Sequence, residues 1–291
     1  MKKEVPLKYI KNIKEDKYGI KKLQNKILEI AVYFDEFCRK NNIKYFLMGG
    51  SALGAMRHKG FIPWDDDLDV FMDHKNYLKL LKNINKIDKA KFYFQEQDSY
   101  EQPYYFSKLR INGTTFMDAF IKKERKIHKG IYIDIMCLYN VPNSRIMQKL
   151  QFYIAGMLKA KANLVYGYKT NSIKKKIELF ISNIVVNRFT KKILYNFVKG
   201  FKNTNLLGHF FGRAKFTNSI YKKEWFKKQR YVPFENVKLP VPSNVEEYLT
   251  VRYGANYMDM PSEKTKAQYQ SHASFWKVDV DYKEYENNEK I

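Results

Sequence analysis

The chain has 291 residues, of which 45% are hydrophobic and 16% aromatic. This length and composition support a sizeable buried core and exclude an intrinsically disordered protein. The formal net charge of +24 favours anionic partners such as nucleotides, nucleic acid, anionic glycans or anionic lipid. A lysine-rich genome composition accounts for the same charge without any such partner.

The cellular compartment is indicated by three features of the sequence. Cys38 and Cys137 both fall in apolar patterns, which indicates buried thiols in a reducing compartment and not a disulfide framework. Residues 1–18 are charged throughout and contain no apolar segment typical of a signal peptide. No stretch reaches about 18 uncharged apolar residues, so no transmembrane helix is expected. We therefore expect a cytoplasmic protein, with contact to the inner face of the membrane left open.

The first half of the chain alternates between helical and strand patterns. Leu23, Ile27, Ile30 and Phe34 recur at helical spacing and predict an amphipathic helix over 21–40. The expected elements that follow are a strand at 43–48, a turn and short helix at 49–58 capped by Ser51, a loop held by Pro63, a strand at 68–72, a helix at 74–85, a strand at 91–96, a hairpin at 106–120 turning at Asn112-Gly113, and a strand at 130–141 ended by Pro142.

The character of the sequence changes after residue 142. Residues 144–167 and 173–201 predict long helices that are apolar on one side and lysine-rich on the other. This pattern favours a helical subdomain packed on the core over contact with an anionic membrane surface. A hairpin, a helix capped near Ser243 and a tyrosine-rich loop follow residue 230. The domains expected are a catalytic core at 1–142, a helical insertion at 143–227, a C-terminal part that completes the core at 228–280, and a disordered tail at 281–291.

Four aspartates within residues 65–69 stand out in so basic a chain. If this segment runs as a strand, Asp67 and Asp69 share one face with Asp65, and Asp66 points the other way as a bystander. Carboxylates at this spacing suit Mg²⁺ or Mn²⁺ held together with substrate phosphates. Asp134 offers a further carboxylate, because a charged residue inside an apolar strand is costly unless it is paired or metal-bound. A solvated acidic turn is the alternative, and the sequence context favours the metal site.

The residues around the acids suggest phosphate binding. Gly49, Gly50 and Ser51 stand between a strand and a helix, where backbone N–H groups favour phosphate. The order of strand, Gly-Gly-Ser, helix and D-x-D strand is a nucleotidyltransferase signature. Candidate residues for neutralising a diphosphate are Arg57, Lys108 and Arg110. His58 is left undecided between a base and a loop residue, and His128 is a second candidate for substrate contact.

These motifs resemble the LicD family in their order and spacing. The resemblance covers residues 25–142 and 228–262, and its most specific block is "GGSALGAMRHKGFIPWDDDLD". The C-terminal part of the resemblance includes Tyr248, Tyr253, Gly254 and Tyr257. Lys129-Gly130 departs from the His-Gly pair common in the family, and His128 lies one residue earlier.

The resemblance implies an α+β fold with a nucleotidyltransferase-like mixed β-sheet core flanked by helices. It implies metal ligands at Asp65, Asp67, Asp69 and Asp134. The implied activity is Mg²⁺-dependent transfer of phosphocholine or a related polyol phosphate from CDP-choline or a similar CDP-alcohol. The acceptor is a glycan or a lipid-linked oligosaccharide of lipopolysaccharide, capsule or teichoic acid.

Two rival functions remain at this stage. One is a true nucleotidyltransferase that attacks the α-phosphate of a nucleoside triphosphate, and the core motif is compatible with it. The other is a nucleic-acid-binding module based on the positive charge, which needs exposed aromatics on a basic face. Most aromatic residues here fall in core-like patterns, so no nucleic-acid partner is expected.

Overall fold

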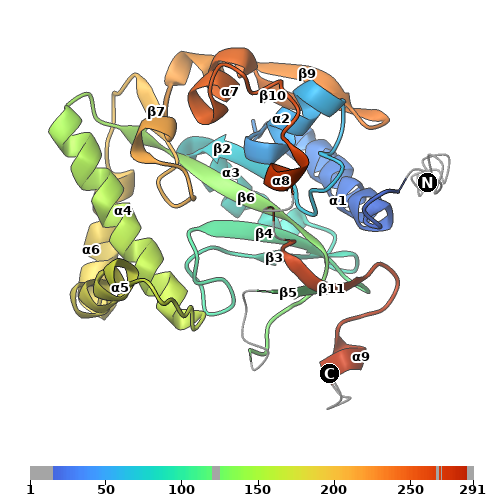
Figure 1. Ribbon diagram of the computed structural model, residues 1–291, viewed down its shortest axis with the longest axis horizontal. Helices are drawn as coiled ribbons and strands as arrows, with labels where there is room; N and C mark the ends of the chain where they lie inside the picture. Colours follow the sequence, from blue (N-terminus) through green and yellow to red (C-terminus); the bar gives the residue numbers. More distant parts are fainter. Residues whose placement is uncertain (1–15, 120–124, 267–268, 270, 287–291) are drawn as a thin grey trace.

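The computed structural model describes residues 16–119, 125–266, 269 and 271–286. Most of the charged N-terminal segment, in which no signal peptide is expected, lies outside the described residues. The elements form a mixed α+β architecture around one central sheet (Figure 1).

The central sheet is mixed and seven-stranded, with the order β1-β2-β6-β4-β3 along its main path and β7 and β8 off this path. The strands of the main path are β1 (Phe46–Leu47), β2 (Asp69–Asp73), β3 (Phe92–Gln95), β4 (Phe106–Ile111) and β6 (Tyr132–Val141). β2 and β6 run parallel, whereas the other three pairs are antiparallel. The distal half of β6 extends beyond β2 and β4 and pairs with β7 (Leu206–Gly208), which in turn pairs with β8 (Ile220–Lys222).

Helices cover the sheet as the apolar periodicity predicts. The predicted first helix is confirmed as α1 (Lys21–Lys40), which buries Leu23, Ile27 and Phe34 in the core. α3 (His74–Asn83) starts at an N-cap made by Asp73, whose side chain accepts a hydrogen bond from the Asn76 amide, and it is followed by η3 (Ile84–Lys86). α2 (Gly49–His58) packs against α7 (Val245–Tyr253) and the hairpin of β9 (Gln229–Phe234) and β10 (Val237–Pro242).

The hairpin predicted over 106–120 is wrong in its pairing. A turn does occur at Gly113, which has φ +70°, but β5 (Thr115–Asp118) leaves the central sheet and pairs with β11 (Ala273–Lys277). Both edges of β4 are already occupied, by β3 on one side and by β6 on the other. A strand following the turn therefore has no hydrogen-bonding edge of β4 available.

The region after β6 forms three helices at one end of the molecule, α4 (Arg145–Val165), α5 (Ile173–Val185) and α6 (Arg188–Lys199) (Figure 1). α5 and α6 both pack against α4. Two short 3₁₀ helices, η4 (Phe216–Asn218) and η5 (Lys223–Phe226), follow α6 in the chain and precede β9. Within the described residues, every helix is too short or too polar to cross a membrane.

The C-terminal segment is better packed than its polar sequence suggests. Disorder was expected from residue 281, yet Tyr282 is buried and its amide donates to the Thr114 carbonyl. Lys129 and Glu286 form an ion pair that anchors α9 (Lys283–Glu286). α8 (Glu263–Lys266) precedes β11. Residues 281–286 are thus packed against the rest of the chain, and residues 287–291 of the expected disordered tail lie outside the described part.

Candidate active site

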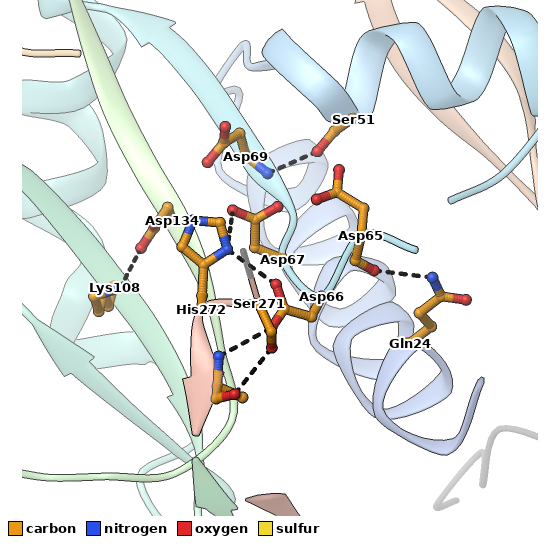
Figure 2. Close-up of polar contacts among 11 residues, drawn as sticks. Gln24, Ser51, Asp65, Asp66, Asp67, Asp69, Lys108, Asp134, Ser271 and His272 are labelled. Carbon is orange, nitrogen blue, oxygen red and sulfur yellow. Dashed lines mark hydrogen bonds and ion pairs between the residues drawn. The ribbon is translucent and has the colours of Figure 1, made fainter. Parts of the chain in front are cut away.

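The central sheet aligns three charged residues on adjacent strands. The register pairs Asp69 of β2 with Asp134 of β6, and Asp134 with Lys108 of β4. Residues paired across a sheet share one face, so two carboxylates and one ammonium lie in a row. Lys108 Nζ is 2.7 Å from Asp134 Oδ1, and both side chains are buried (Figure 2).

The loop before β2 adds two further carboxylates to this row. β2 begins at Asp69, so the strand assumed in the parity prediction for Asp65 and Asp67 does not exist there. Gln24 of α1 nevertheless shapes the loop, because its Nε2 donates to the carbonyls of Ile62 and Asp65 at 3.1 and 2.9 Å. Figure 2 shows the side chains of Asp65, Asp67 and Asp69 gathered at the start of α2.

This gathering of acids has an electrostatic cost. Burial raises the pKa of Asp69 well above its usual range, and the neighbouring Asp67 and Asp134 raise it further. Burial likewise raises the pKa of Asp65, with Asp67 and Asp69 adding to the effect. The pKa of Asp67 is raised by burial and held down in part by His272. The site therefore holds more negative charge than its neighbours compensate, as a cation-binding site does.

Asp66 is not the bystander that strand parity predicts. Its side chain is 4% exposed and accepts hydrogen bonds from Ser271 Oγ, His272 Nδ1 and the Ala273 amide at 2.6, 2.9 and 3.0 Å. These bonds outweigh burial and lower the pKa of Asp66 to about 2. Asp66 thereby fastens the start of β11, some 200 residues away in the chain, to the loop that carries the other acids.

His272 is a residue of the site that the sequence did not reveal. Its Nδ1 lies 2.9 Å from Asp66 Oδ1 and 3.5 Å from Asp67 Oδ2. The hydrogen bond to Asp66 raises the pKa of His272 to about 10 against the effect of burial, so the imidazole is a cation at neutral pH. No local pattern around His272 announces this role, because its partners are distant in sequence.

The glycine pair allows the acids to approach the helix. A Cβ atom on Gly50 would lie 2.8 Å from Asp65 Oδ2, and one on Gly49 would lie 3.2 Å from Asp69 Oδ2. Gly49 also has φ +59°, which disfavours any residue with a side chain. The first-turn amides of α2 have no partners within the helix and favour negative charge in front of them. The start of α2 therefore stabilises negative charge on the carboxylates of Asp65 and Asp69 and on a bound phosphate.

Ser51 does not cap α2 as the sequence predicts. The N-cap position is Met48, and Ser51 Oγ instead accepts a hydrogen bond from the Asp69 amide at 2.8 Å. Tyr248 of α7 supports the same turn, because its hydroxyl accepts the Gly49 N–H at 2.8 Å. The helix α7 begins near Ser243 as predicted, with its N-cap at Asn244, while Ser243 itself donates to the Trp225 carbonyl. Ser51 and Tyr248 thus fix the position of β2 relative to the helix start.

The three basic residues predicted to hold a diphosphate have different surroundings. Lys108 is next to the acids, but its Nζ is paired with Asp134 and lies 3.3 Å from the centre of the Tyr132 ring. Arg110 is buried, and it donates to Gln95 Oε1 and to the Gly130 carbonyl at 2.6 Å each. These bonds give Arg110 a structural role in joining β3, β4 and the start of β6.

Arg57 connects α2 to the tyrosine-rich loop. Its Nη1 donates to the carbonyls of Tyr257 and Asp259, and its Nε donates to His58 Nε2. Burial lowers the pKa of Arg57 and also that of His58. The side chain of Arg57 is therefore committed to backbone carbonyls, and a change at Arg57 is expected to act through the position of this loop.

His128 lies apart from the acids. It stacks on Tyr93 with a centroid separation of 4.7 Å and lines a cavity of 540 Å³, and none of the four aspartates lines that cavity. Burial, with Arg110 nearby, lowers its pKa to about 3, so the ring is neutral at physiological pH. Its ring nitrogens contact Asn112 and the Gly130 amide. The geometry gives no support to contact between His128 and a substrate held at the acids.

The chemistry of the donor set fits a hard divalent cation. Aspartate oxygens are the ligands that Mg²⁺ prefers, and the pKa values of Asp65, Asp67 and Asp69 are raised by burial first and by neighbouring carboxylates second. Among the described residues, no three acidic, histidine or cysteine side chains already converge closely enough to ligate an ion. Metal binding at Asp65, Asp67, Asp69 and Asp134 therefore stays a prediction.

Comparisons with known proteins connect the same residues to one family. Residues 42–165 match the family model "LicD/FKTN/FKRP, nucleotidyltransferase domain". The lipopolysaccharide cholinephosphotransferase LicD of Haemophilus influenzae is 28% identical over 257 residues, which cover 85% of this chain and 94% of that protein. Uncharacterized proteins of Rickettsia prowazekii and Rickettsia typhi are 38% and 31% identical over 101 and 96 residues, or about a third of this chain.

The matched segment coincides with the candidate site. Residues 42–165 include the glycine turn, the aspartate loop, β2, β4 and β6, and therefore all four aspartates predicted as ligands. The segment leaves out His272 and Tyr248, which come from the C-terminal part that folds back on the site. Residues 42–165 are thus similar to a LicD/FKTN/FKRP nucleotidyltransferase domain, and most of the chain is similar to the lipopolysaccharide cholinephosphotransferase LicD of Haemophilus influenzae.

Proposed function

We propose that this transferase moves phosphocholine, or a related polyol phosphate, from a CDP-activated donor to a hydroxyl group of a cell-surface glycan. The observation that carries the proposal is the gathering of Asp65, Asp67 and Asp69 near the start of α2, with Asp134 paired to Asp69 on the adjacent strand. The cholinephosphotransferase of Haemophilus influenzae supports this choice of donor and acceptor, because the match covers almost all of that protein.

The proposed reaction is an in-line displacement at phosphorus. The acceptor hydroxyl attacks the β-phosphorus that carries the alcohol, the bond from this phosphorus to the bridging oxygen breaks, and CMP leaves. Mg²⁺ held by Asp65, Asp67, Asp69 and Asp134 supplies neutralisation of the charge on the diphosphate. The Gly50 and Ser51 amides bind a phosphate oxygen at the helix start. Asp134 accepts the hydroxyl proton, and Lys108 holds this carboxylate in place.

The test is a product analysis with matched donors. The purified chain is incubated with Mg²⁺, an acceptor glycan, and either CDP-choline, CDP-ribitol, CDP-glycerol or CTP. Chromatography measures CMP, pyrophosphate and the mass of the acceptor. We expect CMP release and an acceptor that gains the phosphorylated alcohol, and we expect neither product from Asp69→Asn. Pyrophosphate release from CTP with transfer of CMP to the acceptor would instead establish a true nucleotidyltransferase and contradict the proposal.

A further inference from the structure

The helix α5 turns its apolar side away from the protein. Large apolar side chains recur at helical spacing and are 46–75% exposed, namely Ile173, Ile177, Phe180, Ile181 and Ile184. The two buried residues of α5, Leu179 and Ser182, lie on the opposite side of the helix. A surface helix normally packs its apolar stripe on the core and leaves its polar side in water. The orientation of α5 is the reverse of that arrangement.

The helix α6, which follows α5 directly in the chain, also exposes large apolar side chains. Only two residues separate α5 from α6, and Phe189 and Ile193 in the first half of α6 are 82% and 68% exposed. Val198, the buried residue of this helix, lies on the side away from them. A capping box at Asn187 and Thr190 fixes the start of α6, so Phe189 has a defined position. Together these side chains form what we call the α5–α6 face: Ile173, Ile177, Phe180, Ile181, Ile184, Phe189 and Ile193.

The charges around the α5–α6 face are almost all positive. Residues 173–199 contain seven lysines and arginines and a single acid, Glu178. At 3.6 residues per turn, Lys174 and Lys176 fall on either side of the α5 stripe, and both are exposed. Long lysine side chains in this position can bury their stems along an apolar surface while the ammonium groups reach outward.

We propose that the α5–α6 face docks this protein on an anionic lipid membrane, with both helices lying in the plane of the interface. Exposed aliphatic and aromatic side chains enter the boundary of the acyl chains, and the flanking lysines contact lipid phosphates. The charge argues against a second copy as the occupant, because two such faces would bring like charges together. Figure 1 places α4, α5 and α6 at one end of the molecule, so docking leaves the sheet and its acids uncovered.

The proposal is tested with the full chain and vesicles. Sedimentation compares phosphatidylcholine vesicles with vesicles that also contain phosphatidylglycerol, at low and high salt. We expect binding to the anionic vesicles that weakens as salt rises. The variant Phe180→Ser/Phe189→Ser is expected to bind the anionic vesicles at least about tenfold more weakly, because two aromatic side chains that would enter the membrane are lost. Leu78→Ser on α3, where Leu78 is 46% exposed, is the matched control and is expected to bind normally.

Charge and folding are examined by further variants and measurements. Lys174→Gln/Lys176→Gln is expected to reduce the preference for anionic over neutral vesicles. All variants are expected to keep the thermal midpoint of the parent chain and its CMP release with a soluble acceptor, since these side chains are exposed. The docking proposal does not depend on the transferred group, so a failed transfer assay and a failed vesicle assay are distinguishable.

Three results would overturn the proposal. The first is absence of binding by the parent chain to anionic vesicles, and the second is equal binding by Phe180→Ser/Phe189→Ser and Leu78→Ser. The third is a stable dimer of the parent chain that Phe180→Ser/Phe189→Ser dissociates, because the face would then be an interface between two copies.

Discussion

The anchor between Asp66 and the C-terminal segment can be removed by Asp66→Asn. This change keeps the shape of the side chain and deletes the charge that accepts bonds from Ser271, His272 and Ala273. The pKa of Asp66 is lowered from 3.8 to about 2, which corresponds to about 2–3 kcal/mol of stability at neutral pH. The raised pKa of His272 describes the same ion pair, so it is not added to this figure.

The pH dependence of stability follows from the direction of each shift. The contribution of Asp66 is present above pH 3.8 and is lost as pH falls through about 2. The contribution of His272 is fully present below its ordinary pKa of 6.5 and is lost as pH rises through about 10. We therefore expect the parent chain to lose stability between pH 6.5 and 9.5. Asp66→Asn should remove most of this loss of stability, because the hydrogen bond to Asp66 is the largest cause of the raised pKa of His272.

Urea unfolding followed by circular dichroism provides the assay, in buffer with a chelator so that bound metal does not contribute. Measurements at pH 5.5, 7.5 and 9.5 compare the parent chain with Asp66→Asn. Asp279→Asn is the matched control, because Asp279 is an exposed acid in the same C-terminal segment. The reasoning is refuted if Asp66→Asn and Asp279→Asn unfold at the same urea concentration at pH 5.5 and show the same decline toward pH 9.5.

Three further predictions address the row of charges and the glycine turn. Asp69→Asn should reduce transfer at least about 100-fold and leave stability unchanged or higher, because it relieves repulsion within the acid cluster; a lower urea midpoint would contradict this. Lys108→Met should lower the free energy of unfolding in urea by about 3–5 kcal/mol, because it leaves the Asp134 carboxylate buried without its partner. A decrease below about 1 kcal/mol would be inconsistent with the buried ion pair. Tyr248→Phe should lower the free energy of unfolding by about 1 kcal/mol, because the hydrogen bond between the Gly49 amide and the Tyr248 hydroxyl is lost. Tyr253→Phe leaves that hydrogen bond intact and is the control in the same assay.

The local patterns of the sequence determined much of the fold. The apolar spacing in residues 21–40 predicted α1, and the run from 130 to 141 predicted β6, because both patterns follow directly from which side of the element is buried. The order of glycine turn, acidic loop and strand also indicated the resemblance to the LicD family and the candidate acids. Cys38 and Cys137 are both buried free thiols, as their apolar surroundings predict.

Only the tertiary structure decided which partners these residues have. Asp66 was assigned to the wrong role because parity describes a strand, whereas this loop is held by His272 and Ser271, about 200 residues later. Lys108 and Asp134 become partners through strand pairing, and β5 leaves β4 because both edges of β4 are occupied. The outward orientation of the apolar stripe on α5 is likewise invisible in its periodicity. A helical pattern specifies that a helix has an apolar side, but only packing against the rest of the chain decides which way that side faces.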